Sequence, residues 1–154
     1  MRRSVSFVSS AVALTVIGLA APRAAHPAQD ASTTSTCAVS APVPDRPHDD
    51  PHASSFASPN GTWYANDERT VWAWWWGNVP PSRSFKVLWV RPAGEQIRVT
   101  GRRLDGPSDP MTANIPDGYP HTFQASGLTF PTAGCWQVEA TVQSARLDFV
   151  VRVP

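Results

Sequence analysis

The chain has 154 residues, of which 16% are charged, and its 13 basic and 12 acidic residues give a net charge of +1. This length is typical of a single domain. The balanced charge excludes a strongly basic nucleic-acid-binding protein, whose contacts with phosphates require clustered positive charge.

The N-terminus has the pattern of a secretory signal peptide. Two arginines precede an apolar stretch from Val5 to Ala21, and a basic region followed by a short apolar region is typical of such signals. We predict a signal peptide over residues 1–20, because Gly18 and Ala20 supply the small residues that cleavage requires. The alternative is a retained membrane anchor, but the run is shorter than the ~20 apolar residues that span a bilayer. We therefore expect no membrane span once the signal is removed.

The two cysteines, Cys37 and Cys135, lie near opposite ends of the expected mature chain. Export would place them in an oxidising compartment, where a pair of cysteines is most simply a disulfide. We predict a bond that ties the start of the mature chain to its end. The alternative is two free thiols.

Residues 21–55 are rich in Pro, Ala and Ser and contain no aromatic residue and no Leu, Ile or Met. Such a segment buries too little apolar surface to offset the entropy of ordering it. We expect a flexible arm that is fixed mainly where Cys37 is tied down. The aromatic residues concentrate from Phe56 onward, so the folded domain is predicted over residues 56–154.

Within this domain, apolar and polar residues alternate as in strands with one buried face. The C-terminal runs Trp136–Val142 and Leu147–Val153 predict an antiparallel hairpin, with Trp136 buried at the start of its inward face. The stretch Asn66–Trp76 is ambiguous, because Asn66 could instead cap a short helix. The earlier expected strands are Thr62–Ala65, Thr70–Trp76, Phe85–Arg91, Gln96–Leu104 and Leu128–Phe130. About seven short strands in roughly 100 residues predict an all-β, immunoglobulin-like β-sandwich.

Three motifs stand in the second half of the chain: Gly101–Pro107 (GRRLDGP), Ile115–Tyr119 (IPDGY) and Phe130–Val138 (FPTAGCWQV). Together they resemble a family of uncharacterised secreted bacterial proteins. The third motif also resembles the final hairpin of many bacterial immunoglobulin-like extracellular domains. The resemblance implies a β-sandwich that is secreted or held in the cell envelope. It implies no activity.

No common catalytic or nucleotide-binding motif occurs in the sequence, and we predict a protein that is not an enzyme. Asp105 and Asp109 could form an acid–base pair, but both stand in ordinary turn sequences. The segment His48–His52 resembles a metal site in composition. Its prolines prevent a helix that would align the side chains, so we expect a solvated linker, no metal site and no cofactor.

The densest unusual feature is the run Trp72–Trp76. In a strand, Trp72, Trp74 and Trp76 share one face, while Ala73 and Trp75 face the other way. One interpretation makes the tryptophans a core, with the arm covering the remainder. The other makes Trp72, Trp74 and Trp76 an exposed platform for sugar rings or a partner protein.

Arg102 and Arg103 complete the candidate ligand-binding residues. Two guanidinium groups could grip a carboxylate or phosphate, or one of them could pair with Asp105 and steady the following turn. The sequence thus predicts an exported, monomeric, non-catalytic module with a binding or structural role toward an unknown protein or carbohydrate. The specific alternative is a carbohydrate-binding module that uses an exposed tryptophan face.

Overall fold

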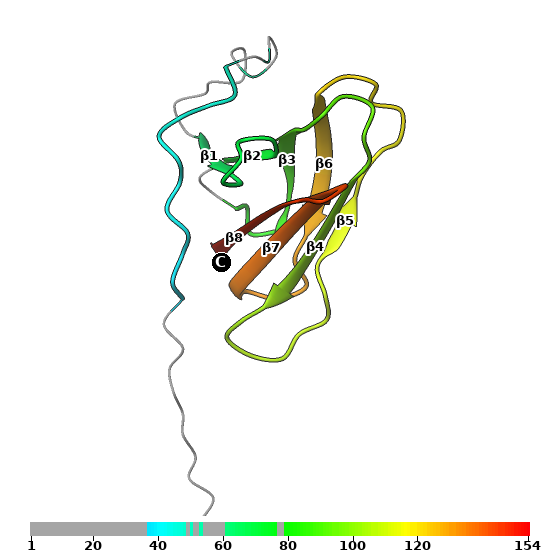
Figure 1. The fold of residues 1–154 in the computed structure, drawn as a ribbon. Helices are drawn as coiled ribbons and strands as arrows, with labels where there is room; N and C mark the ends of the chain where they lie inside the picture. The colour runs from blue at the N-terminus through cyan, green and yellow to red at the C-terminus, as the bar shows by residue number, and fades with distance from the viewer. Residues whose placement is uncertain (1–36, 49, 51–52, 54–60, 77–78) are drawn as a thin grey trace, which may run out of the picture. The chain divides into compact units, whose positions relative to one another are not determined.

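The computed structural model describes residues 37–48, 50, 53, 61–76 and 79–154, and of Trp76 only the backbone. The predicted signal peptide, residues 1–20, lies outside this part of the chain. The described residues form eight β-strands and no α-helix (Figure 1). The strands are β1 (Gly61–Ala65), β2 (Trp72–Trp76), β3 (Ser84–Val90), β4 (Ile97–Arg103), β5 (Thr112–Asn114), β6 (Phe123–Thr129), β7 (Gly134–Val142) and β8 (Ala145–Val153).

The strands form two antiparallel sheets, with the orders β1-β2-β3-β6-β5 and β4-β7-β8. If β2 to β8 are given the letters A to G, these orders contain ABED and CFG. That is the strand arrangement of the constant-type immunoglobulin sandwich, to which β1 adds one edge strand beyond β2. The predicted all-β, immunoglobulin-like sandwich is confirmed, with eight strands in place of about seven.

Two features of the strand prediction need correction. The three-residue strand β5 was not expected, and β6 is longer than the predicted Leu128–Phe130. The buried positions of β6 include Gln124 and Ser126, so its buried face lacks the apolar alternation that marks a strand. Ser126 is nevertheless satisfied, because its hydroxyl accepts a 2.7 Å hydrogen bond from the indole N–H of Trp89.

The capped helix considered for Asn66–Trp76 is wrong. The side-chain oxygen of Asn66 accepts hydrogen bonds from the backbone N–H groups of Thr70 and Val71, both at 2.9 Å. Asn66 therefore closes the turn between β1 and β2. The strand that follows is the predicted one, shortened by two residues at its start.

A core of apolar side chains fills the space between the two sheets. Trp136 is fully buried there, as predicted, and its indole N–H donates to the carbonyl of Thr132 at 3.0 Å. Phe149 stacks on Tyr64 with ring centroids 4.4 Å apart, which links β8 to β1 across the sandwich. Gly134, before Trp136, has φ +142°, and a Cβ there would lie 2.5 Å from Arg103 Nε. A larger residue would therefore clash at this corner.

The described part of the predicted arm lies against the sandwich and contacts both sheets. Cys37 and Cys135 form a disulfide, and Ser40 exchanges two hydrogen bonds with Val150 on the edge strand β8, at 2.9 and 2.8 Å. The arm then pairs with the other sheet, where Val43 N–H donates to Trp63 O at 2.8 Å. It closes one open side of the sandwich and covers two strand edges, which is a common protection against edge-to-edge association.

Candidate functional site

The tryptophan run does not form an exposed platform. The predicted alternation holds, since Val71, Ala73 and Trp75 belong to the core between the sheets. Trp72 and Trp74 belong to a second apolar cluster on the outer face, yet they are only 5% and 1% exposed. The exposed-platform hypothesis is therefore wrong for these two residues, and the side chain of Trp76 lies outside the described part.

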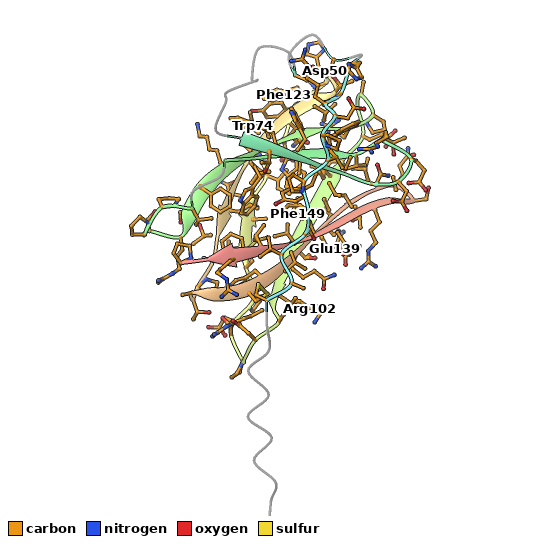
Figure 2. All side chains as sticks on the ribbon, turned by 90° about the vertical axis from the view of Figure 1, so that its left-hand side faces the viewer. Asp50, Trp74, Arg102, Phe123, Glu139 and Phe149 are labelled. Atoms are coloured by element: carbon orange, nitrogen blue, oxygen red, sulfur yellow. A yellow bond between two sulfur atoms is a disulfide. The ribbon has the colours of Figure 1, made fainter. Side chains whose placement is uncertain are left out.

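The arm and the neighbouring strands explain this burial. Ala53 is fully buried in the outer cluster, and Val43 packs against it. Asp50 is 4% exposed and accepts hydrogen bonds from the Thr122 hydroxyl and from Ala53 N–H. Figure 2 shows Asp50 and Trp74 on this side of the protein. An apolar face this large is costly to leave in water, and the arm removes it from solvent, as the core interpretation expected.

Arg102 and Arg103 are neighbours on β4 with different surroundings. Arg103 Nε pairs with Asp105 Oδ1 at 2.7 Å. This hydrogen bond, followed by one from the backbone of Cys135, lowers the pKa of Asp105. Arg102 is exposed on the outer face of the three-stranded sheet, where Figure 2 also labels Glu139. Neighbouring residues of a strand face opposite sides of the sheet, so the two guanidinium groups start from different faces, and Arg103 is engaged by Asp105 at the following turn.

The segment His48–His52 also divides into separate roles. His48 pairs with Asp45 at 2.6 Å in solvent, whereas Asp50 is buried beneath the arm. Residues 49, 51 and 52 lie outside the described part. Within the described ranges, no three His, Cys, Asp or Glu side chains gather as a metal-binding group would require.

A buried arginine that the sequence analysis did not single out organises one end of the sandwich. Arg91 follows β3 directly and is only 3% exposed. Its Nε donates to Gln124 Oε1 at 2.7 Å, and its Nη2 donates to the carbonyl of Tyr119 at 3.0 Å. Its Nη1 donates to the carbonyls of Pro92 and His121 at 2.9 and 3.3 Å. Burial lowers the pKa of Arg91, and the charge of nearby Glu95 partly opposes this.

These bonds connect two loops that meet at the same end of the sandwich. One loop joins β3 to β4 over residues 91–96, and the other joins β5 to β6 over residues 115–122. Gln124 adds a third tie, since its Nε2 donates to the carbonyl of Pro116 at 3.0 Å. Gly94 and Gly118 have φ of 75° and 84°, a backbone conformation that favours glycine. The guanidinium thus holds both loops in one arrangement.

A polar hollow of about 280 Å³ lies between the two loops. Glu95, Asp117 and Tyr119 are among the residues that line it. The remaining lining residues are Arg91, Gly94, Gln96, Pro116, Gly118, Pro120 and Gln124. Small-ligand sites are concave and use a few polar groups to orient the ligand, and the residue types of this lining include charged, amide and aromatic ones.

The sequence contained two signals for this hollow. Asp117, Gly118 and Tyr119 belong to the IPDGY motif, whose Pro and Gly residues indicate a turn between strands. Arg91 is a charged residue that directly follows the apolar residues at the end of β3. A charged residue at such a position indicates either that the buried part of the strand ends there or that the charged group is buried and hydrogen-bonded.

Comparisons with protein-family models, with curated protein sequences and with solved structures returned no match. In the part of the chain that the structure describes, no helix has the length and apolar character needed to cross a membrane.

Proposed function

We propose that this protein is an exported, non-catalytic binding module that takes part of its ligand into the hollow between the 91–96 and 115–122 loops. The observation that carries this proposal is the buried guanidinium of Arg91, which fixes both loops through four hydrogen bonds to neutral acceptors. Burying a charge is costly, and the cost is offset here by bonds that shape a concave polar surface.

Export is supported by two independent features. The N-terminal sequence has the pattern of a signal peptide. The Cys37–Cys135 disulfide is compatible with an oxidising compartment outside the cytoplasm.

Binding without catalysis fits the way the hollow is built. The Arg91 guanidinium has five N–H donors, and four hydrogen bonds to the protein use most of them. Gln124 likewise uses both its amide oxygen and its amide nitrogen within the fold. These two side chains therefore form a rigid floor. Glu95, Gln96, Asp117 and Tyr119 are left to contact a ligand.

A ¹⁵N–¹H NMR screen of the disulfide-bonded protein tests this proposal. The probes are neutral sugars, choline and lysine as cations, acetate and phosphate as anions, and short neutral peptides. We expect at least one class to shift the amide signals of Gly94 and Gly118 saturably, and Tyr119→Ala to abolish the effect. Asp109→Asn removes a carboxylate from the loop between β4 and β5, at the opposite end, and should bind as the native protein does. The proposal fails if no class shifts these amides.

One observation favours a second candidate, a protein-binding surface on the outer face of β4, β7 and β8. Arg146 pairs with both carboxylates of this face, with Glu139 at 2.9 Å and also with Asp148. Arg98, Arg102 and Arg152 are exposed, and among the described residues they form no ion pair. Such a face suits an acidic protein partner. Arg102→Glu should then weaken capture of the partner, whereas Lys86→Glu on the other sheet should not.

A further inference from the structure

The charges around the loop-end hollow favour a neutral ligand. Arg91 already donates to four neutral acceptors, so it does not need an anionic ligand. Its positive charge lies close enough to Glu95 for the two to interact, and the two charges offset each other. Asp117, an exposed residue of the lining, adds one negative charge. The hollow therefore has a small net negative charge, which disfavours an anion and is weaker than the clustered carboxylates that select a strong cation.

The hydrogen-bonding groups of the hollow favour a ligand rich in donors. The carboxylates of Glu95 and Asp117 only accept hydrogen bonds, whereas the amide of Gln96 both accepts and donates. Accepting groups therefore outnumber the donors that remain for a ligand. Hydroxyl groups are neutral donors that suit such a lining, and hydrogen bonds to ionised acceptors are stronger than those between neutral groups.

The volume of the hollow and the presence of Tyr119 in its lining narrow the class of ligand further. A volume of about 280 Å³ lies just below the ~300–1,000 Å³ typical of ligand cavities, so the site accepts a group the size of one ring. Tyr119 adds a flat apolar surface with a polar tip. A sugar ring combines C–H groups on its faces with hydroxyl groups around its rim, and it matches this combination.

We infer that the hollow binds one ring of a neutral carbohydrate, with Asp117 and Glu95 accepting hydrogen bonds from its hydroxyl groups and Tyr119 packing against its apolar face. This inference rests on the proposed function and names its ligand class. It places sugar recognition on the loops, away from the tryptophans of β2, which are buried.

The test is an NMR titration of the disulfide-bonded protein with glucose, galactose, mannose, N-acetylglucosamine and their disaccharides. We expect millimolar or tighter binding of at least one sugar, with saturable shifts at Gly94 and Gly118. Asp117→Asn keeps the shape of the side chain and removes its charge, and it should weaken binding about tenfold or more. Tyr119→Ala should abolish binding at the concentrations used. Asp109→Asn is the matched control and should leave the affinity unchanged.

The outcomes separate this inference from the proposed function. If choline, lysine, acetate, phosphate or a neutral peptide binds at the hollow and no sugar does, the carbohydrate inference is wrong and the proposed function stands. If a sugar binds but Asp117→Asn and Tyr119→Ala bind it unchanged, the site is elsewhere and the inference is also wrong. If no probe reaches the hollow, both fail. Circular dichroism of each variant excludes loss of fold as the cause.

Discussion

Replacing Arg91 by Met should destabilise the protein and loosen the loops around the hollow. The substitution keeps an apolar stem but removes four hydrogen bonds. The carbonyls of Pro92 and His121 belong to exposed residues and can regain water. Gln124 is 4% exposed, so its side-chain oxygen would lose its partner in a buried site.

An unsatisfied buried acceptor costs about 1–3 kcal/mol, and a hydrogen bond from a charged donor contributes a similar amount. Removing the buried charge also relieves its desolvation, which offsets part of the loss. We therefore expect Arg91→Met to lower the free energy of unfolding by about 2 kcal/mol, a large share of the ~5–15 kcal/mol of a typical domain. Arg91→Lys should not restore stability, because one ammonium group cannot reach acceptors arranged around a planar fork.

Urea unfolding under non-reducing conditions, followed by tryptophan fluorescence, measures the change. Hydrogen exchange of the amides in residues 115–122 should accelerate in parallel. Arg98→Met is the matched control, since Arg98 is exposed on β4 and such substitutions usually change stability by no more than about 0.5 kcal/mol. An Arg91→Met protein as stable as Arg98→Met, with unchanged exchange in the loop, would refute this account of the buried guanidinium.

Three further predictions concern the core, the arm and the turn after β4. Trp136→Ala removes a fully buried indole and should cost about 3–5 kcal/mol, so an unchanged melting temperature would contradict the assigned core. Cys37→Ser opens a bond between residues 98 positions apart and should cost up to about 4–5 kcal/mol. It should also shift tryptophan emission to the red as Trp74 meets water, and an unshifted spectrum would mean that the arm stays docked without its disulfide. Arg103 holds the pKa of Asp105 below its ordinary 3.8, so this carboxylate stabilises the fold above that pH and loses its contribution as the pH falls through the lower folded-state value. In acid titrations of unfolding free energy, Asp105→Asn should therefore show a shallower slope below pH 3.8 than the native protein, and identical slopes would count against the ion pair.

The sequence predicted the fold best where the alternation of apolar and polar residues along a strand is sufficient to identify it. The β7–β8 hairpin follows from strict alternation, and its buried face is the predicted one. The strand predicted from the sequence at β6 is too short, because Gln124 and Ser126 occupy buried positions that apolar residues usually fill. Their hydrogen-bond partners, Arg91 and Trp89, lie on β3 or directly after it. No local pattern reports such pairings.

The arm and the hollow also depend on contacts that local sequence patterns do not predict, here between residues that lie farther apart in the chain. Composition predicts that residues 21–55 form no core of their own, but docking onto an existing apolar face requires only a few contacts such as those of Val43 and Ala53. The alternation of the tryptophans between the two faces of β2 was predicted from the sequence. The burial of Trp72 and Trp74 on the outer face, however, depends on the arm, which precedes β2 in the chain. The hollow depends on bonds from Arg91 to carbonyls 28 and 30 residues further on, and this pairing exists only once both loops are folded.

One NMR titration with N-acetylglucosamine and the other sugars named above compares the two candidate surfaces directly. The backbone amides of Gly94 and Gly118 report on the hollow, and the indole N–H groups of Trp72 and Trp74 report on the outer face of β2. We predict saturable shifts of the two glycine amides while both indole signals stay in place. Saturable shifts of the indole signals without shifts of the glycine amide signals would contradict this prediction. They would indicate that the ligand binds at the tryptophan face of β2.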